Sequence, residues 1–294
     1  MKGTYHSSAM VKKGLSPIVG ANELLALHQQ QDFILIDVSN SHDAFTNYQN
    51  RHLKGALFVD LNAQLADIKD DFSKGGRHPL PTTEQFSRTL SSLGITKNSH
   101  VVVYDDKSAA NSAARFWWML KAAGHEWVQV LNGGLQAAQK AGYPLEKDIN
   151  QPQQAEPYKI EKWQLPLADM AEVASAATDG KSIVIDVRDS ERYNGIVEPV
   201  DLVAGHIPGA INIPFKLNLD SNGLFLPPEA LQKIYQESFN RAQPANMIVH
   251  CGSGVTACHT LLAMAYAGFE LPKLYVGSWS EWSRNNQPIA AQKL

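Results

Sequence analysis

The chain has 294 residues, of which 44% are hydrophobic and 19% charged, a composition typical of a globular protein with two domains. Its formal net charge of −3 excludes the broad basic surface that nucleic-acid binding requires, and no apolar run approaches the ~20 residues of a membrane span. Its two cysteines are too few for a disulfide framework, so we expect a reducing compartment, the cytoplasm.

The first half of the chain begins with residues 1–16, which carry lysines but no apolar stretch and so indicate a loose tail instead of a secretory signal. Short β-branched apolar runs then predict buried strands, and an Ala-rich run that ends near a glycine predicts a helix. In chain order, the predicted elements are strands over 33–38 and 101–104, a helix over 113–120 and a strand over 128–131.

The second half repeats this pattern. Both first strands end in Asp-Val, and each is followed by a His-x-x-Gly-Ala motif, which begins at His52 in the first half and at His206 in the second. Landmarks in the same order indicate a duplication. Strands that alternate with helices predict an α/β fold of two tandem domains, each a parallel sheet flanked by helices. The elements predicted here are strands over 182–187 and 247–250, a helix over 256–264 and a strand over 274–276.

A segment rich in Gln, Pro and Asn, residues 148–157, separates the two halves and has the composition of a linker. The predicted organisation is a flexible N-terminal tail over 1–16, a first domain over 17–147, a linker over 148–164 and a second domain over 165–294.

The sequence Cys-Gly-Ser-Gly-Val-Thr, residues 251–256, connects a predicted strand to a predicted helix. Its glycines allow a tight loop whose N–H groups, from Gly252, Gly254, Val255 and Thr256, point at one centre, and the following helix adds the positive end of its dipole. An anion is favoured there. We therefore expect Cys251 to be a nucleophilic thiolate with a pKa below the free value of ~8.5. The alternative is that Cys251 is a small buried hydrophobic residue.

This loop resembles the active-site loop of the 3-mercaptopyruvate sulfurtransferases, within the tandem rhodanese superfamily, and the resemblance extends from about residue 17 to the end of the chain. Thiosulfate-cleaving members of the superfamily usually carry basic residues where this chain has Gly252 and Ser253. Three further motifs carry the resemblance: Gly-His-Ile-Pro-Gly-Ala over 205–210, Val-Tyr-Asp-Asp over 103–106 and Gly-Ser-Trp-Ser-Glu-Trp over 277–282.

The resemblance implies two tandem rhodanese-like domains and a two-step sulfur transfer. Cys251 would take the sulfur atom of 3-mercaptopyruvate, a small-molecule donor, and hold it as a persulfide while pyruvate leaves. A thiol acceptor such as thioredoxin, or cyanide, would then remove the outer sulfur. The resemblance implies no metal and no organic cofactor, and charge and composition predict no nucleic-acid and no membrane partner.

A polar relay beside the nucleophile is also implied by the resemblance. Ser253 would join a histidine and an aspartate of the first domain. The histidine maps to His52, although Leu53 and Lys54 stand where Ile-Pro is usual, and Asp43 is the candidate aspartate. The alternatives are a solvated loop acid for Asp43 and, for His52, a structural histidine like the one expected at the repeat position His206.

The carboxylate of the donor requires a cation, and arginine suits it because the planar guanidinium binds a carboxylate through two hydrogen bonds. Arg188 and Arg192 follow the predicted strand 182–187, at the edge of a parallel sheet where sites form. By resemblance the substrate arginine is Arg192, whereas Arg188 could instead pair with a carboxylate. A second substrate arginine would follow Glu-Pro-x-Pro, but residues 198–202 contain none, which leaves room for another donor.

The first domain lacks a nucleophile, because the repeats place Asp105 opposite Cys251. This domain is expected to be silent and to form one wall of a cleft between the halves. The other cysteine, Cys258, lies about two helical turns after Cys251 and is expected to be a packed core residue.

Three other functions remain open. Thiosulfate:cyanide sulfurtransferase is the alternative within the same superfamily. A cysteine-dependent phosphatase also uses a loop between strand and helix, but needs an arginine at position 257, where this chain has Ala257. A persulfide carrier that does not turn over a small donor is the non-enzymatic alternative.

Overall fold

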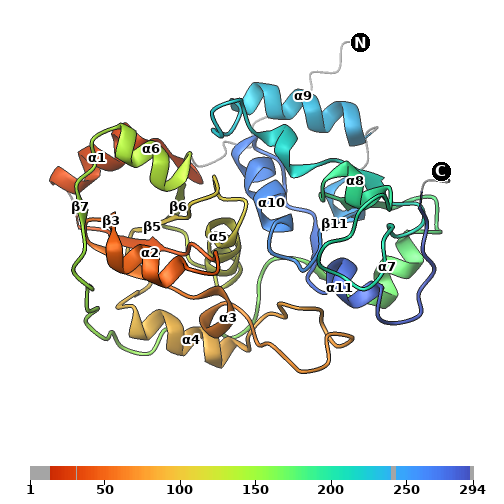
Figure 1. Ribbon diagram of the computed structural model, residues 1–294, viewed down its shortest axis with the longest axis horizontal. Helices are drawn as coiled ribbons and strands as arrows, with labels where there is room; N and C mark the ends of the chain where they lie inside the picture. The colour runs from red at the N-terminus through yellow and green to blue at the C-terminus, as the bar shows by residue number, and fades with distance from the viewer. Residues whose placement is uncertain (1–13, 31, 240–242, 292–294) are drawn as a thin grey trace, which may run out of the picture.

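The computed structural model describes residues 14–30, 32–239 and 243–291, which form two α/β domains side by side (Figure 1). Each domain has a five-stranded parallel sheet with helices on both faces, which confirms the predicted fold class. Most of the expected N-terminal tail, residues 1–13, lies outside the described ranges.

The sheet of the N-terminal domain alternates its side chains between two apolar layers. Ile36 and Val103 face α4 and α5, whereas Leu35 and Val102 face α1, α2 and α6. In sheet order the strands are β1 (Ile18–Val19), β6 (Val128–Leu131), β5 (Val101–Tyr104), β2 (Ile34–Asp37) and β4 (Ala56–Phe58). The helices are α1 (Ala21–Gln30), α2 (Ala44–Asn50), α3 (Leu61–Gln64), α4 (Thr83–Ser92), α5 (Ser112–Ala122) and α6 (Gly134–Lys140).

The C-terminal domain has the same arrangement. Its helices α9 and α10 cover one face of the sheet and α7 and α11 the other. In sheet order the strands are β10 (Ile211–Asn212), β9 (Ile183–Asp186), β11 (Met247–His250), β12 (Lys273–Tyr275) and β8 (Leu167–Ala168). The helices are α7 (Met170–Ala176), α8 (Ser190–Tyr193), α9 (Pro228–Phe239), α10 (Ala257–Tyr266) and α11 (Ser278–Trp282), with 3-10 turns at Phe215–Asn218 and Pro244–Asn246.

The duplication read from the sequence is therefore a structural one. Strands β4, β2, β5, β6 and β1 lie in the same order as β10, β9, β11, β12 and β8. A small antiparallel pair repeats as well: β3 (His52–Leu53) pairs with β7 (Leu145–Glu146), and His206 forms a bridge with Ala290.

The predicted elements agree closely with the observed ones. The strands over 101–104, 128–131 and 247–250 have the predicted bounds, and those over 33–38 and 182–187 are one residue shorter at each end. The helices over 113–120 and 256–264 are α5 and α10, and both end before glycines with positive φ, Gly124 and Gly268. Glycine adopts this conformation without the steric penalty that other residues incur.

The two domains share a buried apolar interface. Helix α5 packs against α10, and one continuous apolar cluster contains residues of both domains. Residues 147–166 join the domains without a helix or strand and run along the N-terminal domain, where the backbone N–H of Tyr158 donates to Ser91. No helix in the described part of the chain is long and apolar enough to cross a membrane.

Candidate active site

Cys251 follows β11 directly, at the carboxyl end of the central strand of its sheet, where side chains of neighbouring strand ends converge. The residue is only 3% exposed, and it lies at a cavity of about 110 Å³. The loop that follows it, the arginines beside that loop and one 3-10 turn line this cavity: Arg77, Arg188, Asp189, Arg192, Phe215, Gly252, Ser253 and Thr256.

The loop after Cys251 leaves its backbone donors unused. Gly254 has φ +74°, and a Cβ there would lie 2.5 Å from the carbonyl oxygen of Val276, so the turn requires glycine. The backbone N–H of Cys251 donates to Ser278 Oγ, whereas the N–H groups of residues 252–256 have no acceptor among the described residues. Unpaired N–H groups at the start of a helix are a binding site for an anion.

The N-terminal domain demonstrates this preference for an anion. The carboxylate of Asp105, at the position equivalent to Cys251, accepts hydrogen bonds from four backbone N–H groups of its own loop. Burial raises the pKa of Asp105 to about 6, and the N–H groups oppose that rise. The N–H groups of the first loop thus bind the carboxylate of Asp105, whereas the equivalent position of the second loop carries the thiol of Cys251. The donors to Asp105 are Lys107, Ala109, Asn111 and Ala113.

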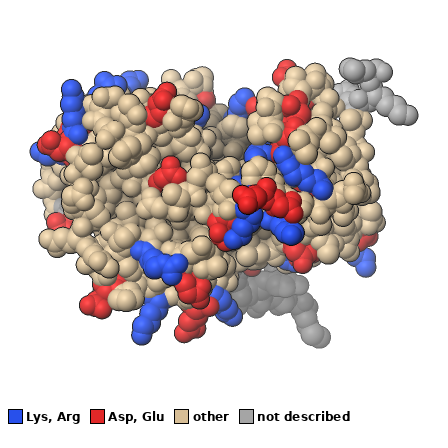
Figure 2. Space-filling model, turned by 60° about the horizontal axis from the view of Figure 1, so that its bottom comes forward, with Lys and Arg blue, Asp and Glu red and all other residues tan. Residues whose placement is uncertain are grey.

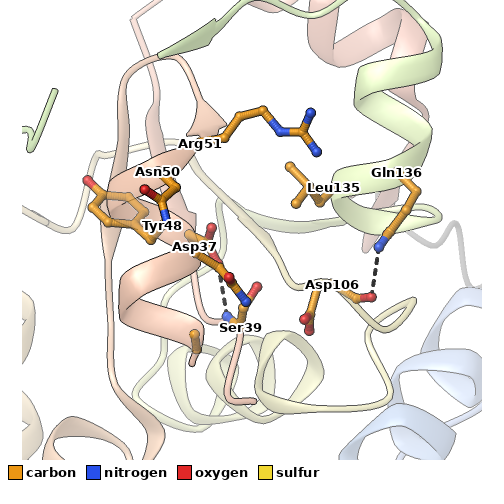
Figure 3. Close-up of a pocket in the computed structure, with 10 residues that line it drawn as sticks. Asp37, Ser39, Tyr48, Asn50, Arg51, Asp106, Leu135 and Gln136 are labelled. Carbon is orange, nitrogen blue, oxygen red and sulfur yellow. Dashed lines mark hydrogen bonds between the residues drawn. The ribbon is translucent and has the colours of Figure 1, made fainter. Parts of the chain in front are cut away.

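A larger cavity of about 400 Å³ lies at the same sheet edge of the N-terminal domain (Figure 3). Asp37 and Asp106 lie on one side of it and Arg51 on another, and its lining contains no cysteine. This cavity therefore contains no thiol, and the catalytic silence of the first domain stays a prediction.

Ser253 has a histidine partner, but it is His78 and not the predicted His52. Nδ1 of His78 lies 2.8 Å from Oγ of Ser253. Burial and the nearby guanidinium groups of Arg115 and Arg77 lower the pKa of His78 to about 4, so its imidazole is neutral at pH 7. A neutral imidazole can exchange a proton with the Ser253 hydroxyl.

The prediction that His52 is the partner of Ser253 is corrected by the structure. His52 is fully buried, its Nδ1 lies 2.6 Å from the carbonyl oxygen of Tyr48, and its ring stacks on that tyrosine. His206 makes the same contacts with Tyr193 in the other domain. Both histidines therefore support equivalent turns of the repeat.

Asp43 does not belong to the relay either. Its side chain is 71% exposed at the start of α2, and it contacts the exposed His42. The solvated loop acid is thus the correct interpretation of Asp43. No carboxylate among the described residues forms a hydrogen bond with His78, and the predicted third member of the relay has no counterpart there.

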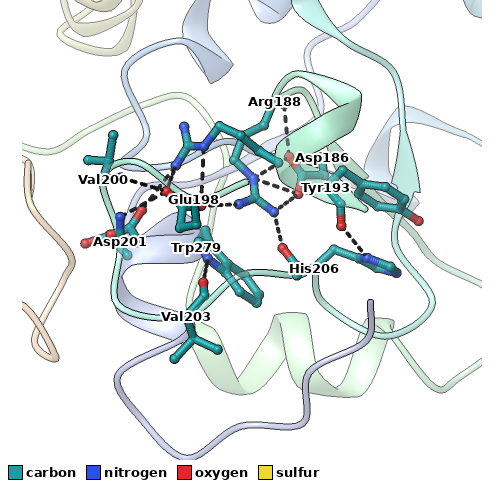
Figure 4. A network of polar contacts seen from close by, with 12 residues as sticks. Asp186, Arg188, Tyr193, Glu198, Val200, Asp201, Val203, His206 and Trp279 are labelled. Atoms are coloured by element: carbon teal, nitrogen blue, oxygen red, sulfur yellow. Dashed lines mark hydrogen bonds and ion pairs between the residues drawn. The ribbon is translucent and has the colours of Figure 1, made fainter. Parts of the chain in front are cut away.

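Arg188 borders the cavity, but it is a structural arginine at the centre of a network of polar contacts, which Figure 4 shows. Its Nε and Nη2 donate to Asp186, its Nη2 also to the carbonyl oxygen of Gly205, and its Nη1 to Glu198. The guanidinium also stacks on Trp279, 4.8 Å from the ring centroid. All its nitrogens are engaged, so the alternative role considered for Arg188, pairing with a carboxylate, is the one observed.

Arg192 and Arg77 have guanidinium groups that remain partly available. Arg192 donates to Glu198 through Nε and Nη2, and Arg77 pairs with Asp201 through Nη1. Both side chains line the cavity, with 19% and 17% of their surface exposed. The sequence predicted that Arg192 lies at the site, but it did not predict Arg77 there.

Arg77 and His78 come from the loop between α3 and α4, which reaches under α11 of the other domain (Figure 1). Gly75 donates its N–H to Glu281 at 2.8 Å, and Asn285 Nδ2 donates to the carbonyl oxygen of Ser73. These contacts hold the loop on the C-terminal domain. The sequence Gly-Gly-Arg-His-Pro over 75–79 was the available signal, because glycines and prolines mark a shaped loop that presents its polar residues.

The remaining predicted residues divide into two groups. Gly252 and Thr256 line the cavity, whereas Gly254 and Val255 contribute only backbone, and the Val255 side chain packs in the core. Cys258 is fully buried, its Sγ donates to the carbonyl oxygen of Gly254, and burial raises the pKa of its thiol to about 12. Cys258 is therefore the packed core residue expected from the sequence.

Charge is dispersed over the face of the molecule seen in Figure 2, where neither sign forms a large continuous patch. Within the described ranges, no cluster of three or more His, Cys, Asp or Glu side chains could hold a metal ion. The groups that border Cys251 are the loop N–H groups, a serine, a threonine and the arginines.

Comparison with known proteins agrees with this arrangement. The model of the rhodanese-like domain matches the chain twice, over residues 20–141 and 169–285. A Pseudomonas aeruginosa protein named a probable 3-mercaptopyruvate sulfurtransferase is 37% identical over 93% of this chain and 97% of its own. Thiosulfate/3-mercaptopyruvate sulfurtransferase 2 of Arabidopsis thaliana is 35% identical over 93% and 86%. The solved 3-mercaptopyruvate sulfurtransferase of Leishmania major superposes with a TM-score of 0.80 at 27% identity, covering 92% of this chain and 75% of that one.

Proposed function

The chain belongs to the tandem rhodanese superfamily of sulfurtransferases, and we propose that it transfers the sulfur atom of 3-mercaptopyruvate to a thiol or cyanide through a persulfide on Cys251. One observation carries this proposal: Cys251 lies at a cavity beside arginines, and the N–H groups of the following loop are unpaired in the described structure. An anionic sulfur at Cys251 would find donors already in place.

In the first half-reaction, the Cys251 thiolate attacks the sulfur of 3-mercaptopyruvate. A sulfur–sulfur bond forms, the carbon–sulfur bond breaks, and its electron pair stays on the pyruvate fragment as an enolate, which takes up one proton to give pyruvate. In the second half-reaction, a thiolate attacks the outer sulfur of the persulfide and Cys251 leaves as a thiolate. We propose that the acceptor is a protein thiol such as that of thioredoxin. We also propose a reducing cytoplasm as the location, which agrees with the two free cysteines of the chain.

The neighbouring residues have distinct parts in this scheme. The N–H groups of residues 252–256 stabilise the thiolate and, after transfer, the persulfide anion. Ser253 and His78 form the proton path next to the reacting sulfur, since their polar atoms lie 2.8 Å apart. Arg192 binds the carboxylate of the donor.

Thiosulfate is the second candidate donor, because a relative that covers most of this chain is named for both donors and because arginines also bind a sulfonate-like anion. Initial rates with 3-mercaptopyruvate and with thiosulfate, at a fixed concentration of cyanide, separate the two. We expect kcat/KM to be higher for 3-mercaptopyruvate. A higher kcat/KM for thiosulfate would overturn this choice of donor and leave the sulfur transfer itself in place.

His78→Asn and His52→Asn form a matched pair that tests the corrected relay. His78→Asn should lower kcat about 10²-fold, the contribution typical of one general acid–base group, with little change in the melting temperature. His52→Asn should leave kcat within about threefold and lower the free energy of unfolding by about 1–3 kcal/mol, because it removes a buried hydrogen bond. The reverse pattern, with kcat lost only in the His52 variant, would restore His52 to the relay.

A further inference from the structure

We propose that Arg77 of the N-terminal domain binds the carboxylate of the sulfur donor together with Arg192, so that the two domains share the donor site. This inference rests on the proposed function of Cys251 and adds a residue that determines which donors are accepted. Its basis is the position of two guanidinium groups, their unused hydrogen-bond donors and the excess of positive charge around them.

The two guanidinium groups converge beside the nucleophile. A Cβ at Gly252 would lie 3.2 Å from Nη2 of Arg77, and 3.5 Å from Nη1 and 3.6 Å from Nη2 of Arg192. Gly252 directly follows Cys251, so both arginines reach the same point, one residue from the attacking sulfur. A side chain at position 252 would take up this space, and glycine leaves it to a ligand.

The nitrogen of each arginine that lies nearest this point is unpaired in the described structure. Arg77 uses Nη1 to pair with Asp201. Arg192 uses Nε and Nη2 to pair with Glu198, and its Nη2 also donates to Asp201 at 3.5 Å. Nη2 of Arg77 and Nη1 of Arg192 donate to no acceptor in the described part of the chain. Each arginine is therefore anchored by a carboxylate on one side and offers N–H donors to the cavity on the other.

The acid that holds Arg77 lies next to the position where the resemblance leads one to look for a second substrate arginine. That position is Leu202, and the residue before it, Asp201, has a fully buried carboxylate that also accepts from Arg284 at 2.9 Å. The segment therefore carries an anion and no cation, and Arg77 brings a cation to this anion from across the domain interface. The guanidinium is thus supplied by the other domain.

The surrounding network has one positive charge more than it has negative charges. Four arginines, Arg77, Arg188, Arg192 and Arg284, face three carboxylates, those of Asp186, Glu198 and Asp201. Asp189 also borders the cavity, but it is paired with Lys216. A buried or half-buried excess charge favours the binding of an anion, and two guanidinium groups around one carboxylate satisfy its oxygens by charge-assisted hydrogen bonds.

Arg77→Met tests the contact when two donors are compared, 3-mercaptopyruvate and mercaptoacetone, which has a methyl group in place of the carboxylate. We expect KM for 3-mercaptopyruvate to rise about ten- to a hundredfold, the loss of one charge-assisted hydrogen-bond partner. KM for mercaptoacetone should change less than about twofold, since it has no carboxylate to lose. Arg88→Met is the matched control: it removes an arginine of the same domain that lies on α4 and borders neither this cavity nor its charge network, and it should leave both KM values within about threefold.

A conservative substitution at the same position makes the test graded. Arg77→Lys keeps the charge but not the planar fork. Its KM for 3-mercaptopyruvate should lie between the values of the wild type and of Arg77→Met.

The outcomes separate the two levels of inference. Suppose that the wild type is active and that Arg77→Met either keeps the KM for 3-mercaptopyruvate or raises the KM of both donors by the same factor. Either result would overturn the role of Arg77 and leave the proposed function standing. If the wild type transferred no sulfur from 3-mercaptopyruvate, from mercaptoacetone or from thiosulfate, the proposed function itself would be contradicted.

Discussion

Cys251→Ser should lower sulfur transfer by about 10⁴-fold or more, since the loss of a covalent nucleophile removes the intermediate and not merely one hydrogen bond. The wild-type chain incubated with 3-mercaptopyruvate should gain about 32 Da, one sulfur atom, and the variant should gain none. Intact-mass measurement and steady-state rates check the two parts of this prediction.

Cys258 provides the control for this experiment within the same chain. It is the other thiol, seven residues on, but it is fully buried and burial raises the pKa of its thiol to about 12. Cys258→Ala should therefore keep the mass gain and keep kcat within about threefold, at a cost of about 1 kcal/mol in the free energy of unfolding. A mass gain that persists in Cys251→Ser and disappears in Cys258→Ala would exchange the roles of the two cysteines.

The mass gain also separates an enzyme from a persulfide carrier. Both would form the adduct, but only an enzyme releases pyruvate repeatedly when donor and thiol acceptor are in excess. A single stoichiometric burst of pyruvate, with no further turnover in the presence of cyanide or reduced thioredoxin, would favour the carrier.

Arg188→Met should lower the free energy of unfolding by about 3–5 kcal/mol, because it leaves the carboxylate of Asp186 buried without its charged partner. Asp186 is fully buried and accepts three hydrogen bonds from the Arg188 guanidinium. Chemical denaturation followed by tryptophan fluorescence measures this loss. The exposed Asp43 is the control, and Asp43→Ala should change neither stability nor kcat by a measurable amount.

The loss of unfolding free energy in Arg188→Met should become smaller as the pH falls. Burial by itself would raise the pKa of Asp186, but His250 and Arg188 hold it below its usual value. A carboxyl with a lowered pKa stabilises the fold above its unfolded pKa, and this contribution disappears as the pH falls through the folded pKa. In Arg188→Met the unpaired carboxyl has a raised pKa instead. The stability difference between wild type and variant should therefore be full at pH 7 and shrink in acid.

The result also decides the role of Arg188 at the cavity. A variant that keeps the stability of the wild type but has a raised KM for 3-mercaptopyruvate would contradict the structural role and make Arg188 a donor ligand. The hydrogen bonds in Figure 4 predict the opposite, because every nitrogen of this guanidinium already has an acceptor.

The sequence by itself determined the parts of this protein that depend on local pattern. Apolar runs of β-branched residues predicted six strands, β2, β5, β6, β9, β11 and β12, to within one residue at each end, because a buried parallel strand requires such a run on both faces. The shorter strands β1, β4, β8 and β10 were not predicted. The duplication followed from the order of landmarks, and the position of Cys251 between a strand and a helix followed from the glycine loop after it. Each of these features is encoded in a continuous stretch of chain.

Only the tertiary structure decided which side chains meet across the two domains. His52 matched a motif, yet its turn lies within the N-terminal domain, where Tyr48 takes its hydrogen bond. His78 and Arg77 belong to an irregular loop, whose course no period or motif predicts, and contacts with Glu281 and Asp201 place them at the second domain. Hydrogen bonds between residues more than a hundred positions apart depend on how the domains dock, and local sequence carries no record of that geometry.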